Sequence, residues 1–123
     1  MKITSFHPMI VSKNSEELIK LFEDLGFEKR HTKTDIEDGQ NVNVTMKDSS
    51  GFRVDVASSD KVPHDRTSIR INVDDFDEAY DFFIAHGFKN TRGDKITTTS
   101  SSVDTYLVSP TGFAITLCHH IKK

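Results

Sequence analysis

The sequence predicts an α+β fold made of two tandem βαβββ modules, and two observations lead to this prediction. The chain of 123 residues aligns with itself without a gap after a shift of 61 residues. The matched pairs are Ile10 and Ile71, Glu17 and Glu78, Phe22 and Phe83, Gly26 and Gly87, Phe27 and Phe88, Val42 and Val103, Gly51 and Gly112, and Phe52 and Phe113. Each copy also carries one helix-like segment flanked by strand-like segments. Because the matched residues are mainly glycines and apolar residues, the repeat is one of backbone conformation more than of chemistry.

Each module contains one predicted helix. The first starts after Asn14 and the second after Asp75, and in each a glutamate three residues later, Glu17 or Glu78, can reach back as in a capping box. Apolar residues follow at helical spacing. Both helices end at a Gly-Phe pair, where glycine adopts the left-handed conformation and phenylalanine folds back onto the last turn.

Strands are expected on both sides of each helix. They lie near residues 3–11, 28–34, 42–47 and 52–58 in the first module and near residues 67–73, 88–92, 102–108 and 113–119 in the second. A module of about 60 residues would be marginally stable alone. We therefore expect one domain, residues 1–123, whose modules span residues 1–61 and 64–123 and share a core, joined by a linker too short for independent domains.

Alternation along the strands predicts one apolar face toward the helices and one polar face. The polar face would carry Ser5, His7, Met9, Asn43, Thr45, Arg53, Asp55 and Ala57 from the first module and Ser68, Arg70, Asn72, Asp104, Tyr106, Ala114, Thr116 and Cys118 from the second. Such a face can be an exposed surface or the lining of a pocket. Alternation alone favours the exposed surface, because antiparallel sheets commonly leave one face to water.

Composition narrows the class of protein. A net charge of −3, a pI near 6.0 and the absence of long Lys or Arg runs predict no nucleic-acid partner. The single cysteine, Cys118, excludes an intrachain disulfide. The sequence has no apolar N-terminal run of signal-peptide length and no transmembrane stretch. We therefore expect a cytoplasmic protein without a membrane partner.

The joint pattern resembles the vicinal oxygen chelate superfamily, which includes glyoxalase I, bleomycin-resistance proteins and extradiol dioxygenases. The resemblance rests on the repeat length, the Gly-Phe helix ends and the Ser-Pro-Thr-Gly-Phe segment at residues 109–113, and it covers essentially the whole chain. It implies eight strands that form a curved, incomplete barrel around a cleft, with the helices outside, and a homodimer. With this resemblance, we expect the polar face to line a pocket.

In metal-dependent members of that superfamily, each module supplies one ligand early on its first strand and one on its last strand. The matching positions are His7 and Asp55 in the first module and Ser68 and Thr116 in the second. His7 fits the superfamily pattern, and Asp55 is one methylene shorter than the usual glutamate. Hydroxyls such as those of Ser68 and Thr116 are poor ligands for a divalent ion. We therefore expect no cofactor, with a divalent metal on His7 and Asp55 as the alternative.

Two arginines of the polar face, Arg53 and Arg70, could hold a carboxylate or phosphate through paired hydrogen bonds. They could instead pair with Asp55 and Asp104 inside the protein. A methionine and a tyrosine could supply apolar or stacking surface. The expected ligand-binding residues are His7, Met9, Arg53, Asp55, Ser68, Arg70, Asp104, Tyr106 and Thr116. No catalytic residue is assigned; His7 is the best candidate for a general base, with Asp55 orienting its ring.

Three functions are compatible with these residues. The preferred one is a small-molecule-binding protein of the glyoxalase/bleomycin-resistance type with a degenerate metal site, holding an anionic or aromatic ligand in the cleft between modules. The second is a metal-dependent lyase or isomerase similar to glyoxalase I, or a dioxygenase, that uses His7 and Asp55. The third is a protein–protein interaction module. Bound metal that depends on His7 would distinguish the second function from the first.

Overall fold

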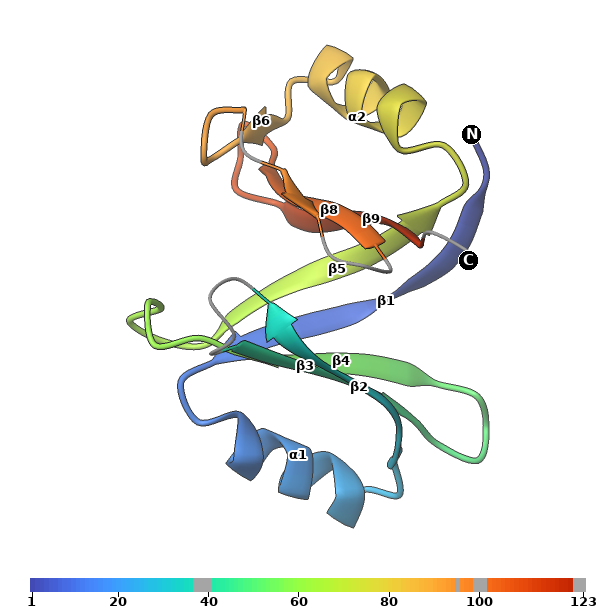
Figure 1. The fold of residues 1–123 in the computed structure, drawn as a ribbon, viewed down its shortest axis with the longest axis vertical. Helices are drawn as coiled ribbons and strands as arrows, with labels where there is room; N and C mark the ends of the chain where they lie inside the picture. Colours follow the sequence, from blue (N-terminus) through green and yellow to red (C-terminus); the bar gives the residue numbers. More distant parts are fainter. Residues whose placement is uncertain (37–40, 95, 99–101, 121–123) are drawn as a thin grey trace. The chain divides into compact units, whose positions relative to one another are not determined.

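The computed structural model describes residues 1–36, 41–94, 96–98 and 102–120 (Figure 1), with only the backbone at residues 31, 33–36, 41 and 42. These residues form two helices and nine strands, so the fold is α+β as predicted. The chain divides into two compact units. The first unit is His7–Thr67, and the second combines Ser68–Lys123 with Met1–Phe6.

The first unit contains one helix on one face of a four-stranded sheet. Its elements are β1 (Ile3–Ser12), α1 (Ser15–Asp24), β2 (Glu28–Ile36), β3 (Asn41–Lys47) and β4 (Arg53–Ser58). The strand order is β2-β3-β4-β1, with β3 antiparallel to both neighbours and β4 parallel to β1. The core consists of Val44, Met46, Val54 and Val56, against which Leu18, Ile19 and Phe22 of α1 pack. The predicted βαβββ order is thereby confirmed.

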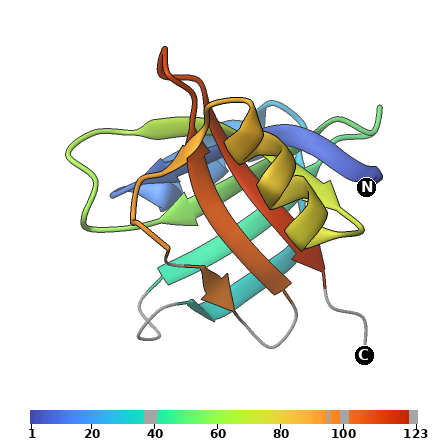
Figure 2. The same cartoon turned by 90° about the horizontal axis from the view of Figure 1, so that it is seen from above.

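The second unit repeats this order with one additional short strand, β7. Its elements are β5 (Arg66–Val73), α2 (Phe76–Ala85), β6 (Lys89–Asn90), β7 (Thr97–Thr98), β8 (Ser102–Val108) and β9 (Ala114–His120). The strand order is β5-β9-β8-β6, with β5 parallel to β9. Figure 2 shows α2 lying over β9, and the core cluster includes Ile71, Phe76, Ala79, Leu107 and Leu117. Strand β7, which pairs with β8, was not predicted, and β6 is shorter than residues 88–92.

The first residues of the chain pack with the second unit, although they precede the first in sequence. The Lys2 backbone N–H donates to Asp74 Oδ1 at 2.6 Å, and the Asp74 backbone N–H donates to the Lys2 carbonyl at 3.1 Å. The Met1 amino group also contacts the Glu78 carboxylate at the start of α2. Strand β1 therefore begins in the second unit and continues into the first.

Both helices end in the predicted way. Gly26 and Gly87 have φ of 107° and 92°, in the region that favours glycine. The Phe27 backbone N–H donates to the Phe22 carbonyl at 2.9 Å, and the equivalent bond at the end of α2 is 3.1 Å. The two phenylalanines of each pair also meet edge to face, at 5.4 Å in the first unit and 5.3 Å in the second. The repeat therefore reproduces the same helix end twice.

The helix starts differ, and one capping prediction is wrong. Asp75 Oδ1 accepts from the Glu78 backbone N–H at 3.0 Å, as predicted. Asn14 makes no side-chain cap bond, and its own backbone N–H donates instead to Ser12 Oγ at 3.0 Å. The physical reason is the backbone: Asp75 has the extended ψ of 101° that suits an N-cap residue, whereas Asn14 has ψ of 62°.

The turns between the last two strands of each unit are also alike. In the β3–β4 turn the Phe52 backbone N–H donates to Asp48 Oδ1 at 2.8 Å. In the β8–β9 turn the Phe113 backbone N–H donates to Ser109 Oγ at 2.9 Å. Each turn contains a glycine with positive φ. These matched turns set the same register in both hairpins, so residues 61 apart occupy equivalent places.

Burial departs from simple alternation. Alternation with the polar-face residues His7, Arg53 and Ala114 places Phe6, Phe52 and Phe113 on the apolar face, yet they are 63%, 68% and 50% exposed. Residues expected on the polar face are instead buried: His7, Asn43, Asp55, Ser68, Arg70, Asn72 and Cys118. Alternation alone favoured an exposed polar face, and for these residues that expectation is wrong. Their burial is possible because most of them are hydrogen-bonded to one another.

Candidate functional site

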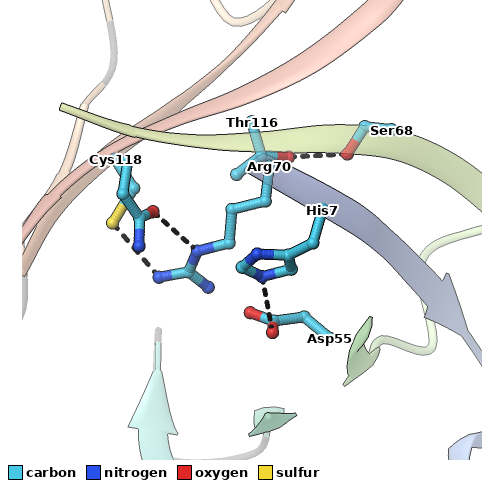
Figure 3. Close-up of polar contacts among 7 residues, drawn as sticks. His7, Asp55, Ser68, Arg70, Thr116 and Cys118 are labelled. Atoms are coloured by element: carbon cyan, nitrogen blue, oxygen red, sulfur yellow. Dashed lines mark hydrogen bonds and ion pairs between the residues drawn. The ribbon is translucent and has the colours of Figure 1, made fainter. Parts of the chain in front are cut away.

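A buried histidine–aspartate pair lies on the polar face of the first unit, on its neighbouring strands β1 and β4. His7 belongs to β1 and Asp55 to the neighbouring β4, where Asp55 is in register with Met9. The Nε2 atom of His7 lies 2.9 Å from Asp55 Oδ1, and the two side chains are 5% and 1% exposed (Figure 3). An ionised carboxylate can only accept, so when Asp55 is ionised the ring donates from Nε2, and this bond fixes the ring orientation.

The equivalent positions of the second unit hold a pair of hydroxyls. Ser68 of β5 and Thr116 of β9 lie 61 residues after His7 and Asp55, and their Oγ and Oγ1 atoms are 2.7 Å apart (Figure 3). Thr116 is in register with Arg70, as Asp55 is with Met9. The same backbone geometry thus brings together a titratable pair in one unit and a neutral pair in the other.

A buried arginine lies next to the hydroxyl pair in the second unit. The guanidinium of Arg70, which is 5% exposed, donates from Nε to Asn72 Oδ1 at 3.1 Å and from Nη2 to Cys118 Sγ at 3.2 Å (Figure 3). These two contacts orient the planar group. Cys118 is fully buried and also serves as a hydrogen-bond partner.

The remaining predicted residues are less buried. Met9 of β1 is half-buried. Asp104 and Tyr106 of β8 are half-buried and pair in register with Cys118 and Thr116, which places them on the same face of the second unit. Arg53 is exposed at the first position of β4. The structure therefore does not bring Arg53 into the buried set.

Solved structures of known proteins share this arrangement of elements. A glyoxalase/bleomycin resistance protein/dioxygenase superfamily member from Vibrio splendidus 12B01 has 16% sequence identity and a TM-score of 0.62, over 96% of this chain and 99% of that chain. Methylmalonyl-CoA epimerase from Mycobacterium tuberculosis has 14% identity and a TM-score of 0.71, over 98% and 90%. A Streptomyces coelicolor methylmalonyl-CoA epimerase in complex with 2-nitronate-propionyl-CoA has 18% identity and a TM-score of 0.67, over 98% and 100%. The chain has the vicinal oxygen chelate fold.

Sequence comparison gives no closer assignment. No family model matches the chain, and no curated protein sequence matches it. In the described part of the chain, neither helix has the length and apolar character needed to span a membrane.

The four residues that the resemblance matched to metal-ligand positions do not offer a usual set of metal ligands. His7 and Asp55 offer one imidazole and one carboxylate, whereas Ser68 and Thr116 offer hydroxyls that already bond to each other. Among the described residues, no three or more His, Cys, Asp or Glu side chains gather in a group able to hold a metal ion. A site that activates a substrate oxygen normally needs three or four such ligands.

One buried polar residue was placed on the polar face by alternation but was not selected as a site residue. Asn43 of β3 is 6% exposed, and its Oδ1 atom is buried without a hydrogen-bond partner among the described residues. The site residues were selected for ionisable or metal-binding side chains, and the amide of Asn43 is neutral. The signal that could have found Asn43 was its position on the same face as Asp55.

Proposed function

We propose that this chain is a small-molecule-binding protein with a degenerate metal site. The observation that carries the proposal is the composition of the four ligand positions, where His7–Asp55 and Ser68–Thr116 form two mutually bonded pairs. Side chains arranged in this way offer directional hydrogen bonds and one titratable pair, but few metal ligands. The burial of His7, Asp55 and Ser68 supports recognition of a ligand, because polar groups shielded from water bind strongly only to partners that complete their hydrogen bonds.

The second unit supports an anionic ligand. The Arg70 guanidinium stays charged at every physiological pH, and Asn72 and Cys118 fix its orientation before any ligand arrives. A fixed guanidinium can bind a carboxylate or phosphate with little further loss of side-chain entropy. Half-buried Tyr106 of the same unit supplies the stacking surface that an aromatic ligand would use.

The neighbouring structures agree with this proposal at the level of the fold. The Streptomyces coelicolor methylmalonyl-CoA epimerase was solved with 2-nitronate-propionyl-CoA, so this fold can hold a small organic molecule. Nothing in that likeness transfers a substrate to this chain.

The proposal is tested first with metals. Protein treated with chelator is titrated with zinc, nickel, cobalt, iron(II) and manganese while its melting temperature is followed, beside the His7→Ala variant. Because a ligand that binds only the folded state raises the melting temperature, a true metal site must be visible. We expect no rise with any of these ions. A rise in the wild type that disappears in His7→Ala would support the metal-dependent enzyme instead.

A second titration uses small benzoates and aryl phosphates with the Arg70→Met variant. We expect a rise in melting temperature for the wild type and its loss in Arg70→Met, because the guanidinium is the proposed anion contact. Arg30→Met provides the matched control, since Arg30 is exposed and its only described ion pair, with Glu28, is 3.8 Å long. A rise that persists in Arg70→Met would contradict the assigned role of Arg70.

A further inference from the structure

Asn43 carries an unsatisfied hydrogen-bond acceptor in an otherwise paired polar face. Asn43 is only 6% exposed, and its Oδ1 atom is buried with no hydrogen-bond partner in the part of the chain that the structure describes. Buried side-chain oxygens in folded proteins are nearly always hydrogen-bonded. Burial removes the hydrogen bond to water, and this loss costs free energy unless a protein group replaces the water. Among the described residues no other buried side-chain oxygen or nitrogen is left in this state.

The register of the sheet places this acceptor beside the His7–Asp55 pair. Asn43 lies opposite Ala57 in the antiparallel β3–β4 pair, and Ala57 is two residues after Asp55 on the same strand. Residues opposite each other, and residues two apart on one strand, share a face of the sheet. Asn43 and Asp55 are thus diagonal neighbours on adjacent strands, roughly 7–8 Å apart between Cα atoms. All four residues belong to the first unit.

The charge of this region favours a particular ligand group. Asp55 supplies a carboxylate and Asn43 an amide oxygen, so two acceptors lie on the same face within the span of one small molecule. Acceptors near a carboxylate attract hydrogen-bond donors that carry partial or full positive charge. An N–H group has this character.

We propose that Asn43 is a specificity-determining residue whose Oδ1 accepts a hydrogen bond from an N–H group of the ligand, so that the ligand class is a small molecule bearing an amine or amide. This inference rests on the proposed binding function and narrows it. An unpaired buried amide destabilises the free protein, and a ligand donor at Oδ1 compensates that loss only in the complex. Asn43 therefore lowers the stability of the free protein and increases discrimination among ligands.

The experiment uses ligand pairs that differ only in the donor. The probes are 2-, 3- and 4-aminobenzoate and the corresponding methylbenzoates, which replace the amino group by a methyl group of similar size. Their affinities are measured by calorimetry for the wild type and for Asn43→Leu, which removes the amide at nearly constant volume. Asn14→Leu is the matched control, because Asn14 is exposed and makes no cap bond. The melting temperature of each ligand-free variant is measured as well.

We expect at least one aminobenzoate to bind the wild type about tenfold more tightly than its methyl partner, the effect of one hydrogen bond. Asn43→Leu should abolish this difference, keep the affinity for the methylbenzoate, and melt at the same temperature as the wild type or higher. The aminobenzoate preference should persist in Asn14→Leu.

Three results would overturn the inference. Equal binding of amino and methyl compounds to the wild type would remove the N–H preference while leaving the proposed binding function intact. A clearly lower melting temperature of Asn43→Leu would mean that the amide is satisfied in the folded protein and is structural. Absence of binding by all six compounds would count against the proposed function and this inference together.

Discussion

The two units have matching helix ends and matching turns between their last two strands but different polar side chains, and this contrast separates the positions that maintain the fold from the proposed binding positions. Both helices end at a glycine with positive φ, and both terminal hairpins contain the same side-chain-to-amide bond. At equivalent positions of the polar face, however, the first unit has a histidine–aspartate pair and the second has two hydroxyls.

The turns match and the polar side chains differ because the two kinds of position tolerate different numbers of residue types. A backbone with positive φ strongly favours glycine, so the turn positions are alike in both copies. A buried polar position requires only that its hydrogen bonds be satisfied, which many residue pairs can do. Differences between the copies therefore mark the positions where chemistry could be varied, and these are the proposed binding residues.

The largest expected effect comes from breaking the titratable pair. Asp55→Ala leaves the buried ring N–H of His7 without its acceptor and should lower the free energy of unfolding by about 3 kcal/mol. Thr116→Ala at the equivalent position of the second unit removes one neutral hydrogen bond and should cost about 1 kcal/mol. Urea unfolding of both variants measures the difference. Equal losses would show that the two pairs stabilise the protein to the same extent.

An intermediate effect is expected at the helix-end glycines. Gly26→Ala should cost about 1–2 kcal/mol, because alanine is strained at a φ of 107°. Gly87→Ala should cost more, since an added Cβ would lie 3.2 Å from Pro110 Cγ, whereas nothing lies within 4 Å at Gly26. Thermal and urea unfolding of the two variants test this order. A larger loss for Gly26→Ala would mean that the contact with Pro110 relaxes easily.

The smallest expected effect distinguishes the helix starts. Asp75→Ala removes a cap bond of 3.0 Å and should cost about 1 kcal/mol. Asn14→Ala should change the free energy of unfolding by a few tenths of a kcal/mol at most, because Asn14 makes no such bond. Urea unfolding again provides the measurement. A comparable loss in Asn14→Ala would indicate that Asn14 caps α1 in solution.

Much of the fold followed from local sequence. The Gly-Phe helix ends, the Asp75 cap and the order of elements depend on residues a few positions apart, and all of these predictions are confirmed. Strand β8 has the bounds predicted for it, residues 102–108. The resemblance to the superfamily also singled out His7 and Asp55, two residues that lie in contact.

Other features could not be read from local sequence. Asn14 has the residue type of an N-cap, but its backbone N–H donates to the Ser12 hydroxyl and its backbone is not in the extended conformation of an N-cap residue. The two-residue strands β6 and β7 depend on pairing with β8 and carry too few residues for a periodic signal. Arg53 and Arg70 are equivalent in type, yet the first is exposed and the second is buried.

Sequence periodicity and turn chemistry settled the α+β class, the repeat and the backbone turns, because these depend on dihedral preferences and contacts between near neighbours. Tertiary structure was required to pair His7 with Asp55 across 48 residues, to join Lys2 to Asp74, and to leave Asn43 Oδ1 buried and unpaired. These features depend on which strands become neighbours and which side chains lose access to water. Contacts between residues far apart in sequence are determined by the packing of the whole unit.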